Sequence, residues 1–180
     1  MRPPARIRLG ISACLLGDKV RYDGGHKRNT FLTDVFGPLV EWVKVCPEVK
    51  VGMGTPREPI RLVEEGGRIR LRAVNTGIDH TASMAAYATT RVDALAGEDL
   101  CGYVLKAGSP SCGMARVNVH AGHFRPAKTG VGLFAQALLA RFPDLPIEDE
   151  ERLADPRLRQ RFIERVFACR RHRDGAPGQL

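Results

Sequence analysis

Residues 6–17 read Arg-Ile-Arg-Leu-Gly-Ile-Ser-Ala-Cys-Leu-Leu-Gly. The first residues alternate between polar and apolar side chains, and the segment then becomes apolar, which predicts a β-strand. Cys14 follows where this strand is expected to end. A single cysteine here indicates little, because free cysteine is among the most buried residue types and packs as a small apolar side chain.

Two other segments repeat this arrangement. Glu41-Trp-Val-Lys-Val45 alternates and runs directly into Cys46, and Gly102-Tyr-Val-Leu-Lys106 precedes a Gly/Ser/Pro loop that contains Cys112. Helices are expected between and after these strands, over residues 82–96, 130–142 and 155–169. Alternating strands and helices predict an α/β fold, a single layered domain with a largely parallel, Rossmann-like sheet. Ligands bind outside the C-terminal ends of such strands, so the three cysteine loops should meet at one edge.

The length and composition favour an ordinary enzyme-sized domain. The chain has 180 residues and a hydrophobic fraction of 43%, enough to bury a core. We expect one domain over residues 1–169 and a basic, flexible tail over residues 170–180. The sequence has no apolar run long enough for a membrane span and no secretory signal, so we expect a cytoplasmic protein and no membrane partner.

The five cysteines are odd in number and far apart, which disfavours a disulfide framework and favours metal binding or catalysis. Cys101 and Cys169 are predicted to be structural, which leaves Cys14, Cys46 and Cys112 as metal ligands. Three protein ligands leave one coordination position open, which is typical of a catalytic site. Thiolates suit soft metals, including iron–sulfur clusters. Zinc remains an alternative, with a fourth ligand among the histidines His26, His80, His120 and His123.

Several polar residues could act beside this metal centre. Glu48 lies two residues after Cys46, where a carboxylate could move a proton. Ser109 and Ser111 could hydrogen-bond a substrate or form the turn that holds Cys112. A dense polar cluster could bind an anionic or hydrogen-bonding ligand, or form an exposed turn; it consists of Asp23, His26, Lys27 and Arg28.

The ordered motifs of the chain resemble one bacterial family. They are Gly10-Ile-Ser-Ala-Cys-Leu-Leu-Gly17, Val20-Arg-Tyr-Asp-Gly-Gly-His26, Cys46-Pro-Glu-Val49, Thr55-Pro-Arg-Glu-Pro-Ile60, Ser109-Pro-Ser-Cys-Gly113 and Gly130-Val-Gly-Leu-Phe-Ala135. The family, long described only as a domain of unknown function, includes thiouracil desulfidase.

This resemblance implies a 4Fe–4S cluster on Cys14, Cys46 and Cys112. It also implies non-redox removal of sulfur from a thiolated nucleobase, in which the sulfur binds the iron without a cysteine ligand and sulfide is released. Glu48 matches the acidic residue of the family's Cys-Pro-Glu motif, the expected proton carrier. Ser109 matches the serine near the substrate, and Ser111, Asp23, His26 and Arg28 are expected substrate-binding residues.

The net charge of +8 leaves a second class of function open. A basic protein could bind nucleic acid and use a cluster structurally, as a binding or sensing module. The aromatic fraction of only 6% argues against this, because aromatic side chains are the usual platforms for base stacking. The favoured partner is therefore a small thiolated molecule, and the sequence does not indicate an oligomeric state.

Overall fold

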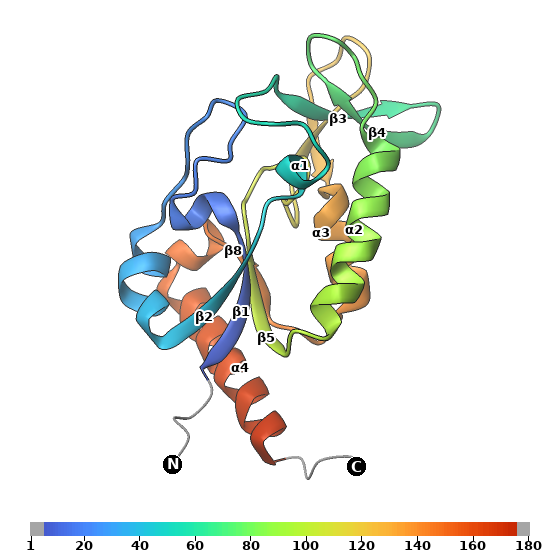
Figure 1. The fold of residues 1–180 in the computed structure, drawn as a ribbon. Coiled ribbons are helices and arrows are strands. Elements are labelled where there is room, and N and C mark those ends of the chain that lie inside the picture. Colours follow the sequence, from blue (N-terminus) through green and yellow to red (C-terminus); the bar gives the residue numbers. More distant parts are fainter. Residues whose placement is uncertain (1–5, 176–180) are drawn as a thin grey trace.

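A parallel sheet forms the base of the molecule. The computed structural model describes residues 6–175. Sheet A has the strand order β2-β1-β5-β8, with all neighbouring strands parallel (Figure 1). The bounds of its strands are β1 (Ile7–Ser12), β2 (Val40–Val45), β5 (Leu100–Leu105) and β8 (Ile147–Asp149). The α/β class and the parallel sheet that the sequence predicted are confirmed.

Helices cover both faces of sheet A. The helices α2 (Thr81–Ala96) and α3 (Leu133–Arg141) pack against each other on one face, and α4 (Pro156–Gly175) lies on the other (Figure 1). Both faces are therefore buried, and every residue of β5 is buried, as expected for a central parallel strand. Short helical segments complete the chain: η1 (Ala13–Leu16), η2 (Phe31–Phe36), η3 (Gly37–Leu39), α1 (Pro47–Lys50) and η4 (Arg152–Ala154).

Gly10 in the middle of β1 has a packing reason. A Cβ atom at this position would lie 2.1 Å from the ring of Tyr103 on the neighbouring strand β5. Glycine thus weakens the local strand propensity but makes room for a large, fully buried aromatic ring in the core.

A second, mixed sheet lies beyond the C-terminal ends of the sheet A strands (Figure 1). Sheet B has the order β4-β3-β6-β7, from β3 (Ile60–Glu65), β4 (Arg68–Ala73), β6 (Val117–His120) and β7 (Ala127–Gly130). The β3–β4 hairpin turns at Gly66 and Gly67, whereas the sequence did not predict β6 and β7. Each of these strands has only four residues, too few for a distinct alternating pattern.

The C-terminal helix is longer than predicted. We expected it to end at Cys169, but α4 continues to Gly175, so residues 170–175 are helical rather than part of a flexible tail. An ion pair between Arg170 and Asp174, one helical turn apart, supports the extension. Residues 176–180 of the predicted tail lie outside the described part of the chain.

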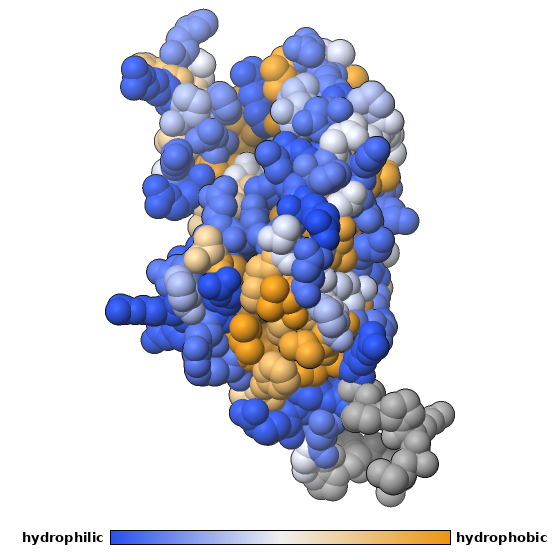
Figure 2. Space-filling view, turned by 90° about the vertical axis from the view of Figure 1, so that its left-hand side faces the viewer, coloured by the Kyte–Doolittle hydropathy of each residue, from blue (hydrophilic) through white to orange (hydrophobic). Residues whose placement is uncertain are grey.

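Apolar side chains are exposed on the surface around η2 and η3. Figure 2 views the molecule from the left-hand side of Figure 1 and shows apolar residues gathered at the height of η2 and η3. The large apolar side chains exposed in these segments are Val35 and Leu39. Among residues 6–175, no helix has both the length and the apolar character needed to cross a bilayer.

Candidate active site

A pocket of about 350 Å³ lies between the C-terminal ends of sheet A and the start of sheet B. Its walls come mainly from the segments that follow β1, β2 and β5, and from Arg57, Pro59 and Ile60 just before and at the start of β3. Among the residues that line it are Cys14, Arg21, Lys27, Cys46, Glu48, Arg57, Lys106, Ser109 and Cys112. The expected meeting of three cysteine loops at one sheet edge is therefore present in the fold.

The three predicted metal ligands all line this pocket. Cys14 lies in η1 directly after β1, Cys46 immediately precedes α1 after β2, and Cys112 lies in the loop after β5. Cys14 belongs to the core on the α4 face of sheet A, and Cys112 belongs to the core on the opposite face. The cores thus hold two of the thiols from opposite sides of the sheet.

Burial controls the protonation of these thiols. It raises the pKa of Cys14 to about 11, and the neighbouring Cys46 thiol adds to this shift. Burial also raises the pKa of Cys46, and it raises the pKa of Cys112 well above its ordinary value. Burial therefore favours the protonated form of all three thiols. A bound metal centre would have to displace these protons, as thiolate ligation requires.

The donor set fits an iron–sulfur cluster better than a single zinc ion. Three thiols from separate loops line one pocket, and soft thiolates are the usual ligands of such clusters. Within residues 6–175, no three His, Cys, Asp or Glu side chains form a group suited to one metal ion. No histidine of the described residues lines the pocket, so none of the four proposed fourth zinc ligands lies there.

The other two cysteines lie together elsewhere. Cys101 is buried inside β5, and its thiol contacts the half-buried Cys169 of α4 in the core on that face. Burial and this contact raise the pKa of Cys101 to about 12. Neither residue lines the pocket.

Glu48 reaches the pocket from α1 and is held at both oxygens. Its Oε2 accepts hydrogen bonds from Nε and Nη2 of Arg57 at 3.0 and 2.5 Å. Its Oε1 accepts the hydroxyl of Ser111 at 2.9 Å. The side chains of Glu48 and Arg57 are only 14% and 6% exposed, so this ion pair is largely desolvated. The carboxylate is therefore fixed in orientation beside the thiols.

The two serines of the cysteine loop have different positions. The Ser109 oxygen accepts the backbone N–H groups of Ser111 and Cys112, at 3.2 and 3.0 Å, and thereby shapes the turn that carries Cys112. Ser109 also lines the pocket. Ser111 is completely buried and does not line it, so its hydroxyl contacts Glu48 from behind rather than facing a substrate.

The predicted polar cluster divides between the pocket and the surface. Asp23, His26 and Arg28 are exposed and do not line the pocket, whereas Lys27 does. Arg28 instead pairs with Asp34 of η2 at 2.5 Å. The Gly25 backbone N–H lowers the pKa of Asp23, which stabilises the turn rather than a ligand site.

Three charged residues that line the pocket had no role predicted from the sequence: Arg21, Arg57 and Lys106. The ammonium of Lys106 pairs with Glu150 at the end of β8 and donates to its neighbouring carbonyl at 2.8 Å. Arg57 belongs to the family motif Thr55–Ile60, and this membership is the signal that could have identified it. Nothing in the local pattern marked Lys106, because its partner is 44 residues away.

Comparison with known proteins gives a consistent result. The sequence model of a family described as 2-thiouracil desulfurase matches residues 9–150. The chain is similar to the uncharacterized protein YbbK of Bacillus subtilis (strain 168), with 29% identity over 134 residues, covering 71% of this chain and 87% of that protein. It is also similar to a solved structure of the 4Fe–4S-dependent thiouracil desulfidase TudS, with a TM-score of 0.68 and 31% identity, covering 86% of this chain and 97% of that one.

Proposed function

This chain belongs to the 2-thiouracil desulfurase family, and we propose that it is a 4Fe–4S-dependent enzyme that removes sulfur from thiouracil or a similar thiolated base. The observation that carries the proposal is the pocket itself. It brings together Cys14, Cys46 and Cys112 from three separate loops and places Glu48 beside them. We further propose a reducing compartment such as the cytoplasm, since the thiols must remain available as ligands.

The three cysteines would hold the cluster through three of its irons. When bound, a cluster with one iron not ligated by the protein supplies a soft Lewis acid suited to a thiocarbonyl sulfur. The rest of the pocket suits a small polar ring: Arg21 and Lys27 at its rim offer N–H donors to the oxygen and nitrogen atoms of a pyrimidine.

Glu48 is the proposed proton carrier. Replacement of sulfur by water at carbon requires a base that takes a proton from the water. The carboxylate lines the pocket and is held in place by its ion pair with Arg57, so it lies where it can accept that proton and pass it on. Because Oε2 already accepts two hydrogen bonds, the remaining acceptor site belongs to Oε1.

Ser109 is the proposed hydrogen-bond donor to the substrate. Its oxygen accepts two backbone N–H groups, and within residues 6–175 no acceptor is paired with its hydrogen. That hydrogen can therefore be donated to a substrate oxygen or nitrogen in the pocket. Ser111 supports Glu48 rather than the substrate.

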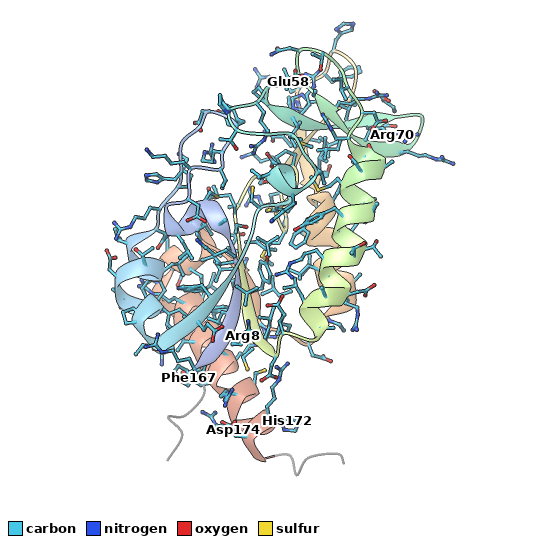
Figure 3. All side chains as sticks on the ribbon, in the orientation of Figure 1. Arg8, Glu58, Arg70, Phe167, His172 and Asp174 are labelled. Carbon is cyan, nitrogen blue, oxygen red and sulfur yellow. The ribbon has the colours of Figure 1, made fainter. Side chains whose placement is uncertain are left out.

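The basic face of α4 has no part in this proposal. Figure 3 shows His172 and Asp174 of α4 at the opposite end of the molecule from Glu58, which lies at the sheet B end. Arg170 and Arg173 in the same segment pair with Asp99, so part of the charge there is neutralised locally.

The test is anaerobic reconstitution followed by incubation with 2-thiouracil, 4-thiouracil and their nucleosides. We expect brown protein that contains iron and sulfide and releases sulfide as the oxygen-containing base forms. Cys112→Ala should lose both cluster and activity, whereas the matched Cys169→Ala should keep both. Glu48→Gln should keep the cluster and lose about 10²–10⁴-fold in rate. Full cluster content in Cys112→Ala, or loaded wild-type protein that desulfurates none of these compounds, would overturn the proposal.

A further inference from the structure

We propose that Arg57 is the positioning residue of this site, and that it orients the Glu48 carboxylate without contacting the substrate. This inference rests on the proposed function, in which Glu48 carries the proton. It concerns a residue of the Thr55–Ile60 segment for which the sequence indicated no chemical role.

All donors of the Arg57 guanidinium are engaged inside the protein. Two N–H groups donate to Oε2 of Glu48, at 3.0 and 2.5 Å, and a third donates to the Val20 carbonyl at 3.0 Å. The other two donate to the Gly54 carbonyl at 2.8 Å and to Oγ1 of Thr55 at 3.4 Å. An arginine side chain has five N–H donors, so none is left for a substrate. Arg57 therefore acts through Glu48.

These contacts determine which carboxylate oxygen faces the reaction. Both bonds from Arg57 end on Oε2, and the Ser111 hydroxyl approaches Oε1. Rotation of the carboxylate would break charge-assisted bonds in a place where water cannot replace them, because the two side chains are 6% and 14% exposed. Oε1, with its remaining acceptor site, is thus the oxygen presented to the pocket.

The same guanidinium ties together three segments, two of which line the pocket. It joins α1, which carries Glu48, to the Val20 carbonyl and to residues 54–55. The Arg57 backbone N–H also donates to the Tyr22 carbonyl at 2.8 Å. The Val20 carbonyl in turn lies 3.8 Å from the Cys46 sulfur. Arg57 therefore sets the distance between Glu48 and the wall beside a proposed cluster ligand.

A lysine cannot reproduce this arrangement, because its single ammonium has three donors and no planar fork. We expect Arg57→Lys to keep the cluster but to lower kcat per loaded cluster by about 10²-fold, with KM changed less than about threefold, since Arg57 has no donor for the substrate. Arg57→Gln, which keeps a planar end with two N–H donors but removes the charge, is the second variant in case the first does not load. The matched control is Arg72→Lys, which weakens a comparable two-pronged contact with Glu65 far from the pocket.

Two further measurements separate positioning from a merely structural role. In the Glu48→Gln background, Arg57→Lys should cost less than about threefold, because the group that Arg57 orients is already disabled. In the protein without cluster, amide hydrogen exchange of residues 20–22 should accelerate in Arg57→Lys and stay unchanged in Arg72→Lys.

The outcomes distinguish this inference from the proposed function. Wild-type kcat in both Arg57 variants, or an equally large loss in the Glu48→Gln background, would overturn the positioning role. Loaded wild-type protein that releases no sulfide would overturn the proposed function instead. In that case the hydrogen-exchange measurement would still test whether Arg57 holds the three segments together. Unchanged exchange of residues 20–22 in Arg57→Lys would overturn this role of Arg57.

Discussion

Gly132, directly before α3, provides a test of how tightly the cysteine loop is held. A Cβ atom at this position would lie 2.4 Å from the carbonyl carbon of Ser111, 2.5 Å from its oxygen and 2.8 Å from the backbone nitrogen of Cys112. All three are backbone atoms, which cannot move aside as the end of a flexible side chain does. The φ of Gly132 is −62°, which alanine adopts without strain, so the effect of Gly132→Ala would come from space alone.

The size of the effect follows from these distances. Ordinary contact begins near 3.4 Å, so the closest backbone atom must move by about 1 Å, the difference between 3.4 and 2.4 Å. Overpacking of this kind costs about 2 kcal/mol in the free energy of unfolding, which lowers Tm by about 4–8 °C in a chain of this size. The same shift displaces Cys112 relative to Cys14 and Cys46, which are attached to other elements.

The assay is thermal unfolding of the protein without cluster, together with iron content after anaerobic reconstitution. Gly132→Ala should show both the lower Tm and a loss of bound iron. Gly97→Ala is the matched control, because a Cβ there meets only the Ala94 carbonyl oxygen at an ordinary 3.6 Å. A Gly132→Ala protein that melts and loads like the wild type would refute the argument that the loop is packed without room for one methyl group.

Two other experiments test the burial of individual side chains. Lys106→Met should lower the free energy of unfolding by about 3 kcal/mol, because it leaves Glu150, only 12% exposed, without its charged partner. The control Lys44→Met removes an exposed ion pair and should cost less than about 1 kcal/mol. Equal denaturant midpoints for the two variants would contradict this reasoning. Cys101, with its pKa raised to about 12, should have a thiolate fraction of only about 10⁻⁴ near pH 8, and should resist iodoacetamide in the folded protein but react after unfolding. Rapid labelling of Cys101 in the native state, followed by mass spectrometry, would show that the contact with Cys169 does not protect it.

The sequence was most informative where a pattern and a special residue occur side by side. Alternation over β1 and β2 predicted strands that end next to Cys14 and Cys46, and the structure has both strands there. The strand-end position of the thiols follows from the chain itself, because a residue after a strand lies at the sheet edge in any parallel sheet. The pairing of short strands such as β6 and β7 was not predictable, because it depends on partners far away in the chain.

For the site too, the sequence predicts some features and the tertiary structure decides others. The sequence by itself determined the chemistry available: three thiols at strand ends, and a carboxylate two residues from one of them. Only the tertiary structure decided which polar groups meet that carboxylate, since the hydroxyl of Ser111 comes from 63 residues away. It also put Lys27 rather than Asp23 or His26 in the pocket. The physical reason is that ligand type is a property of single residues, whereas orientation and burial are properties of contacts between segments that only folding brings together.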